Sequence, residues 1–526
     1  MNTEMEWAQS GRDALLSELQ EMLEHERWDD IAILLDDYFF ALSLAAPDAV
    51  LDLWSRAPRD WVHEHPRYLM AREISRNAWR SSAATERRLE RTFADWVAGQ
   101  DAPAARDVLG VKTAAIRRSL VYGRLDQALK IVDEAQELIR TAQEHDGFDD
   151  VLGSVLLRLG LARLLAGDLD AAIESFSEGW RWSRSTLPHP IAPYLAGHCA
   201  LAHALAGDFA HAEEWLARSE TDISTDPRTM TFHLQKAAVL ARPLIDIAHF
   251  DRAAAEAYLT QSHHDVDSGE LWWIDVHARA RIALYWGEAD GAVRLIERTL
   301  QAYPSLTAPG SLAGMILRAN LSDLRQSQGD LDAAEQVLDA IDATAAHPSV
   351  VTSRARILMK KGQTEDALAL IDRAARGRRR GSSIPSRWQV LRANAAQLMH
   401  APNRPDAIRV AADRIASTRA YDAADEALPR VHDAIAERTR LPPGLRERYP
   451  SSRGAAPDGG PASAERANLT QRELQILELL RTHTAVRDLA AAMFISANTA
   501  KSHLRNLYRK LGATGRDDAL RRADEL

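Results

Sequence analysis

Apolar residues along most of this chain recur every three or four positions, which is the spacing of one face of an α-helix. Pairs of such stretches are separated by a short turn with the pattern Gly-x-x-x-x-Ala, in which the fourth residue is usually acidic. The copies begin at Gly123, Gly167, Gly207, Ala248, Gly287, Gly329 and Gly362, with a degenerate copy at Glu26. A repeat of 33 to 44 residues predicts a series of similar helical hairpins.

The turn residues suit the end of one helix and the start of the next. Glycine adopts positive φ without a Cβ clash and can end the first helix. The Asp two or three residues later suits a turn or N-cap position. One hairpin cannot bury its apolar face alone. Residues 1–440 are therefore predicted to stack as an all-α, helical-hairpin solenoid.

Composition agrees with a helical protein and narrows the chemistry. Ala and Leu dominate and β-branched runs are scarce, which favours helices. The single cysteine, Cys199, excludes a disulfide framework and argues against a cysteine-built metal site. No segment is long and uncharged enough to span a membrane. We expect a cytoplasmic, nucleoid-associated protein with no membrane partner, no metal and no cofactor.

A solenoid presents a concave surface, and we expect this one to receive a small-molecule, peptide or protein effector. Five tryptophans are candidates for lining it: Trp180, Trp182, Trp272, Trp273 and Trp286. They could stack on a ligand, but packing between the helices is the favoured interpretation.

The chain changes character after residue 440. Residues 441–468 are rich in Pro, Gly and Ser and contain few large apolar residues, so they are predicted to form a flexible linker. From Arg466 to Leu526 there are 11 basic and 7 acidic residues, a net charge of +4, so the remainder carries −14 of the total of −10. A basic tail on an acidic body indicates a polyanionic partner.

Residues 469–526 predict a small domain of four helices. Thr470 and Glu473 form a capping box for the first helix, the second runs from about 486 to 493, and Ser496 caps the third. The third helix ends at Gly512, and the fourth covers 517–525.

The third helix is the most informative element because its two faces separate cleanly. Ala500, His503, Leu504, Leu507 and Leu511 share the apolar face, while Asn498, Lys501, Ser502, Arg505 and Arg509 share the opposite face. Such a helix fits the major groove of DNA, where Lys and Arg donate to guanine O6 and N7.

The block with Leu469-Thr-Gln-Arg-Glu473, Ile495 to Gly512 and Arg516-Asp-Asp-Ala519 resembles the LuxR/GerE helix-turn-helix family. The Gly-Asp-Leu-x-x-Ala turns resemble tetratricopeptide repeats, such as those of large regulators related to the maltose regulator. The first resemblance implies that Lys501, Ser502 and Arg505 face bases. It also implies that Asn498, Thr499, Arg509 and Lys510 lie near the DNA backbone.

The same resemblance implies a homodimer on double-stranded DNA, with Ala519 and Leu520 of the fourth helix near the two-fold axis. The sequence departs from the family pattern between the first two helices. The family commonly has Gly and then Ser-Asn-Lys/Arg-Glu there, whereas this chain has His483 and Ala485-Val486-Arg487-Asp488. Arg487 retains a cation at this place.

These patterns predict a sequence-specific DNA-binding transcription regulator whose repeat domain senses a signal or partner. The alternative is a scaffold or adaptor that binds proteins in its groove and DNA only weakly. An enzyme is not expected, because the chain lacks Gly-x-x-x-x-Gly-Lys-Ser/Thr, His-Glu-x-x-His and a Ser/Cys–His motif.

Overall fold

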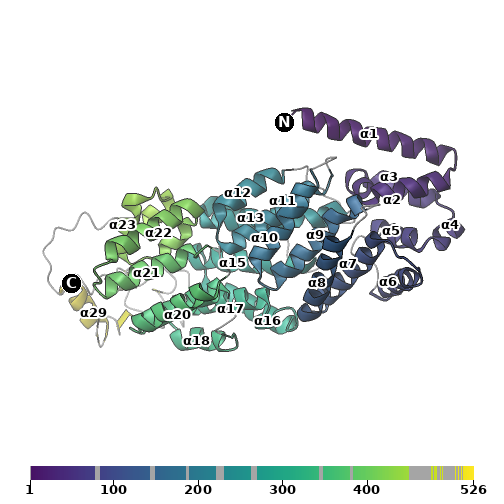
Figure 1. Cartoon of the computed structure of the whole chain (residues 1–526). Helices are drawn as coiled ribbons and strands as arrows, with labels where there is room; N and C mark the ends of the chain where they lie inside the picture. The colour runs from purple at the N-terminus through teal and green to yellow at the C-terminus, as the bar shows by residue number, and fades with distance from the viewer. Residues whose placement is uncertain are drawn as a thin grey trace. The chain divides into compact units, whose positions relative to one another are not determined.

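A computed structural model describes residues 2–76, 83–142, 148–184, 189–220, 230–261, 269–342, 347–378 and 383–448, together with a subset of 476–525. These residues are helical, with no strand among them (Figure 1). The chain divides into two compact units, residues 1–450 and 451–526, which are described separately. No helix in the described ranges combines the length and the apolar character needed to cross a membrane.

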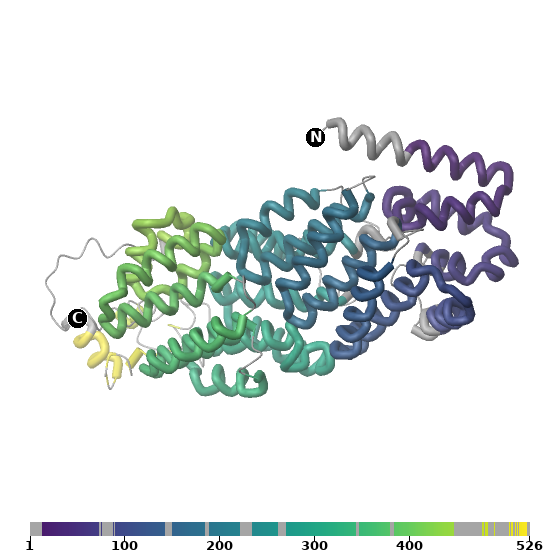
Figure 2. The backbone as a smooth tube through the Cα atoms, viewed as in Figure 1, coloured from purple at the N-terminus to yellow at the C-terminus, as the bar shows by residue number. Residues whose placement is uncertain are grey.

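Most helices of the first unit form hairpins that follow one another along the chain (Figure 2). The pairs are α1 (Asn2–Glu24) with α2 (Trp28–Ala45), α7 (Ala105–Val121) with α8 (Leu125–Thr141), α9 (Phe148–Leu165) with α10 (Leu169–Trp182), α11 (Ala192–Ala206) with α12 (Phe209–Arg218), α13 (Met230–Ala248) with α14 (Arg252–Gln261), α15 (Trp273–Trp286) with α16 (Ala289–Ala302), α17 (Leu312–Ser327) with α18 (Leu331–Asp339), α19 (Pro348–Lys360) with α20 (Thr364–Gly377), and α21 (Ser386–Leu398) with α22 (Arg404–Thr418).

The remaining elements lie between or after these pairs. They are α3 (Pro47–Arg56), α4 (Arg59–Glu64), α5 (Pro66–Arg76), α6 (Ala83–Ala98), η1 (Gly269–Leu271), η2 (Tyr421–Glu426), α23 (Pro429–Arg438) and α24 (Pro443–Arg448). The first unit is thus the all-α array of helical repeats that the sequence predicts.

The predicted turn glycines end the first helix of their hairpins. Positive φ is found at Gly123, Gly167, Gly207, Gly329 and Gly362, and Glu26 of the degenerate copy also has φ of 52°. Gly287 differs, because its φ is −119° and its backbone is extended. The alanine five residues after the glycine is fully buried at Ala128, Ala172, Ala212, Ala334 and Ala367. A small side chain there lets the helices pack closely.

The prediction placed the capping residue one or two positions too late. The carboxylate of Asp168 accepts a hydrogen bond from the Ala171 backbone N–H at 3.1 Å and caps α10, whereas Asp170 lies inside the first turn of that helix. Asp330 caps α18 in the same way, through the Ala333 N–H at 3.0 Å. The N-cap is the residue directly after the glycine, because only a short turn separates the two helices.

The copy predicted to begin at Ala248 begins two residues later. Phe250 has the positive φ, of 58°, and Asp251 accepts from the Ala254 N–H at 3.1 Å. Ala255 is the fully buried alanine of this hairpin. Without a glycine to mark the turn, the sequence pattern placed it on the wrong residues.

The tryptophans pack in the core, as the favoured interpretation predicted. Trp273 is 1% exposed, and Trp180, Trp182, Trp272 and Trp286 are partly buried against core clusters. α11 is buried on nearly all sides, which explains why apolar residues surround it instead of forming one stripe.

Candidate functional site

The described residues of the second unit form a small apolar core. Leu504, Leu507 and Leu511 of the predicted third helix are buried in it. The other buried members of this cluster are Ile476, Leu477, Leu480, Leu489 and Ala519. The three leucines are the face that the sequence assigns to the interior, so the helix turns this face toward its own domain.

The last helix of the second unit, α29 (Arg516–Glu525), is fixed to the other helices by arginines. The Arg516 guanidinium donates to the carbonyl oxygen of Leu480 at 2.8 and 3.0 Å. Arg522 donates to the Leu511 carbonyl at 3.3 Å. Cations placed on carbonyls at helix ends satisfy acceptors that have no partner within the helix.

The residues predicted to contact DNA lie outside the described residues. They are Arg487, Asn498, Thr499, Lys501, Ser502, Arg505, Arg509 and Lys510. Both residues predicted to contact a second copy are described. Ala519 is fully buried in the core of its own unit, and Leu520 is partly buried against that core.

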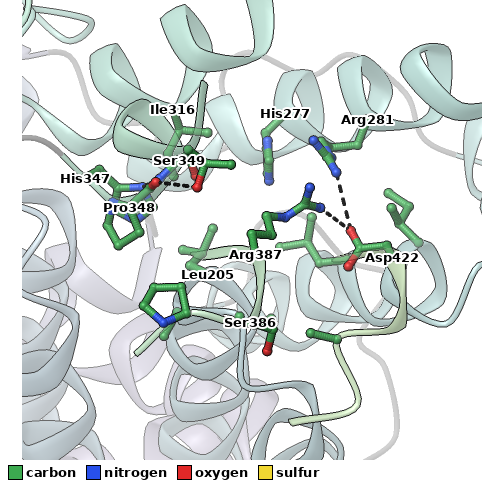
Figure 3. Close-up of a pocket in the computed structure, with 18 of the residues that line it drawn as sticks. Leu205, His277, Arg281, Ile316, His347, Pro348, Ser349, Ser386, Arg387 and Asp422 are labelled. Atoms are coloured by element: carbon green, nitrogen blue, oxygen red, sulfur yellow. Dashed lines mark hydrogen bonds and ion pairs between the residues drawn. The ribbon is translucent and has the colours of Figure 1, made fainter. Parts of the chain in front are cut away.

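The first unit contains a second candidate site, a cavity of about 110 Å³ (Figure 3). It lies among α11, the first residue of α12, α13, α15, α17, η2 and the first turns of α19 and α21. One part of its wall is apolar and includes Leu205, Phe209, Leu244, Ile247 and Ile316. Charged and polar residues form the rest: His277, Arg281, Asn320, Asp323, His347, Ser349, Thr352, Ser386, Arg387, Asp422 and Glu426.

A network of ion pairs forms the charged wall. Arg387 donates to Asp422 Oδ2 at 2.5 Å, to the Tyr285 hydroxyl at 3.0 Å, and to Glu426. Arg281 lies 3.4 Å from both Asp422 and Asp323, and it also contacts Tyr285.

Arg356 of α19 completes this network behind the cavity wall. Its guanidinium pairs with Asp323 and lies 3.5 Å from Glu426. Three cations and three carboxylates are thus paired among the described residues of this network. Burial alone would lower the pKa of Arg387, but Asp422, Tyr285 and Glu426 together raise it well above its ordinary value.

Two histidines face the same cavity. The His347 Nδ1 accepts from the Ser349 backbone N–H at 3.3 Å and caps α19, and the His277 Nδ1 lies 2.8 Å from Asn320 Nδ2. Burial lowers the pKa of each imidazole to about 3, so both are neutral near pH 7. With Nδ1 accepting from an N–H, the neutral His347 carries its proton on Nε2.

One further cluster has the composition of a metal site. The ligand atoms of His203, Asp208 and His211 all lie within 4.8 Å of one another at the turn between α11 and α12. Asp208, however, caps α12 by accepting from the His211 N–H, and its second oxygen is 2.8 Å from His211 Nδ1. Helix capping explains the cluster.

Sequence reasoning did not identify the cavity, because its residues come from separate hairpins and share no motif. The available signal was the presence of charged residues among the apolar residues of predicted helices, such as Arg281 in α15 and Asp323 in α17. Such residues are rarely buried unless they are paired.

Residues 467–523 match a family model described as bacterial regulatory proteins, luxR family. The match begins and ends within the second unit. The carboxyl-terminal unit therefore carries a luxR-family domain, which supports a DNA-binding transcription regulator. The match does not extend to the helical repeats.

Proposed function

We propose that this chain is a sequence-specific transcription regulator in which the helix that ends near Leu511 enters the major groove of DNA. The repeat unit receives the signal that controls this binding. The observation that carries the proposal is the luxR-family match over residues 467–523. A regulatory domain of this kind favours a regulator over an enzyme.

The burial of Leu504, Leu507 and Leu511 supports the assigned orientation of this helix. In an α-helix of 3.6 residues per turn, positions 498, 502, 505 and 509 then fall on the opposite side and position 501 on its flank. In the proposal, Lys501, Ser502 and Arg505 contact base edges. Backbone phosphates are bound by Asn498, Thr499, Arg509 and Lys510, with Arg487 adding a cation from the second helix.

Binding as a homodimer is part of the proposal, with α29 at the contact between copies. Ala519 supports this helix from inside, because its side chain is buried in the core of its own unit. Leu520 is the residue available for the contact, since only part of its surface is covered. Two copies would bind two half-sites of one operator.

The test begins with selection of a preferred sequence from random duplexes by the full-length protein. Lys501→Ala and Arg505→Ala should then each weaken binding to that sequence by roughly 1–3 kcal/mol per half-site. Lys130→Ala is the matched control, because it removes one cation from an exposed position on α8. Affinity should be measured by gel shift over a range of salt concentrations, since phosphate contacts make it fall with salt.

The alternative proposal, an adaptor with weak DNA binding, predicts a different result. No duplex would be enriched, and both substitutions would weaken binding to all sequences equally. That outcome would contradict the assignment of Lys501 and Arg505 to base recognition.

A further inference from the structure

The cavity of the repeat unit has walls of two kinds, which together define the ligand that it could hold (Figure 3). Its volume of about 110 Å³ is several times the ~10–15 Å³ that one water requires. Its lining comes from successive hairpins and from η2, so a molecule inside would contact several repeats at once.

The charged groups on the wall are already neutralised by one another. Arg387 is paired with Asp422 and Glu426, and Arg281 lies between Asp422 and Asp323. A ligand with a net charge would find no unpaired counter-charge among the described lining residues, and placing such a charge in a partly buried space is costly. This arrangement selects for an uncharged ligand.

Two polar atoms of the lining residues lack a hydrogen-bond partner among the described residues. They are the Nε2 of His347, a residue that is 6% exposed, and the Oε2 of Glu426. The first is an N–H donor, because the Ser349 N–H occupies Nδ1, and the second is a carboxylate acceptor. An unpaired buried group is costly, and a ligand that bonds to it would recover that cost.

We propose that this cavity binds an uncharged small molecule with an apolar body and at least one hydroxyl or amide group. A hydroxyl or primary amide both donates and accepts, so it can bond to either the His347 donor or the Glu426 acceptor. The apolar body lies against the side formed by Leu205, Leu244 and Ile316. This inference rests on the proposed function, for which it supplies the class of signal.

Such a ligand would act on the arrangement of the repeats. The ion pairs of the wall connect α15, α17, α19, α21 and η2. A molecule that contacts these elements favours the spacing in which its hydrogen bonds are made. It can shift the conformation of the unit by as much as its affinities for the two arrangements differ.

The experiment uses three probes with closely similar carbon skeletons and different charges: isobutyramide, isobutyrate and isobutylamine. Each is titrated into the full-length protein near pH 7 and followed by ligand-observed NMR. The amide should bind at least ~10-fold more tightly than either ion, because only the amide avoids an unpaired charge. Tighter binding of the carboxylate or the ammonium ion, or no binding of the amide at its solubility limit, would overturn the proposal.

Two variants locate the binding. His347→Asn keeps an N-cap side chain for α19 but removes the imidazole donor. It should lower the affinity for the amide ~5- to 10-fold, as expected for the loss of one hydrogen bond. Ala206→Leu adds volume to a lining residue that is only partly buried and should abolish binding. His211→Asn, at an exposed position outside the lining, is the control and should change nothing.

Unchanged amide affinity in both cavity variants would place the probe elsewhere and refute the assignment. Gel shift of the same protein sample on its selected duplex separates the two proposals. Specific DNA binding without amide binding rejects the ligand class alone. Amide binding without any sequence preference rejects the regulator and leaves the cavity as a ligand site.

Discussion

The two units of this protein use charge in opposite ways. The core of the luxR-family unit, as far as it is described, consists of aliphatic side chains. In the proposed function, the charge of this unit is used outside that core, by cations that bind DNA. The repeat unit instead encloses arginines and carboxylates around a cavity. A small domain buries a smaller fraction of its surface than a large array does, so it has less apolar burial to offset the desolvation of enclosed charges.

The comparison also shows where each unit is vulnerable. A buried ion pair contributes little when both partners are present but costs much when one is removed. A small apolar core depends on each of its few large side chains. Substitutions in each unit therefore test these two dependencies.

Arg387→Met should destabilise the repeat unit by about 3–5 kcal/mol, because Asp422 and Glu426 lose their closest cation. Urea unfolding followed by circular dichroism would measure the loss. Arg373→Met, at an exposed position of α20, is the control. Adding Asp422→Asn and Glu426→Gln to Arg387→Met should recover part of the loss. A loss of stability as small as that of the control would show that the repeat unit does not depend on the network for its stability.

Leu507→Ala should destabilise the luxR-family unit by about 2–5 kcal/mol, because Leu507 is fully buried in its core. DNA binding should be lost, while the unfolding of the repeat unit stays unchanged. Hydrogen exchange resolved by peptide would report the two units separately. In the Leu520→Ala variant, which changes a partly buried position, the core amides should be protected from exchange almost as well as in the native chain. Equal losses of protection in the two variants would contradict the described core.

Stability of the repeat unit should fall as pH decreases below about 6.5. His277 and His347 have a pKa of about 3 in the folded chain, so the unfolded chain binds more protons between pH 6.5 and 3. Their contribution is complete above the unfolded pKa and is lost as pH falls through this window, by up to about 1.4 kcal/mol per pH unit for each imidazole.

Urea midpoints at several pH values between 7.5 and 4.5 would measure this dependence. His347→Asn should reduce the slope, because one of the neutral buried imidazoles is gone. A variant with the native slope would mean that His347 is accessible to protons in the folded state.

Asp168→Ala should cost about 1 kcal/mol, since the capping bond to the Ala171 N–H is lost. Asp170→Ala, inside the first turn of the same helix, should cost less, because Asp170 does not cap the helix and its interaction with the helix dipole is weaker than a capping hydrogen bond. Thermal unfolding of both variants would test which aspartate is the cap. The reverse ranking would restore the assignment made from sequence.

The repeats were predictable from sequence because their information is local. A glycine with positive φ, a following aspartate and a buried alanine lie within six residues of one another, as at Gly167–Ala172. Where the glycine is missing, as at Phe250, the same reasoning misplaced the turn by two residues. The apolar face of the third carboxyl-terminal helix was predictable for the same reason, because helical spacing alone groups Leu504, Leu507 and Leu511.

The cavity could not be predicted, because tertiary structure alone brings its residues together. Arg281 and Asp422 are 141 positions apart in the chain, and no spacing rule connects them. The stacking of hairpins decides which charged side chains meet, and burial then decides that they must pair. The sequence by itself therefore determined the helices, their turns and the helix proposed to contact DNA. The tertiary structure decided where charges are enclosed, because long-range packing sets the distance between groups and their access to water.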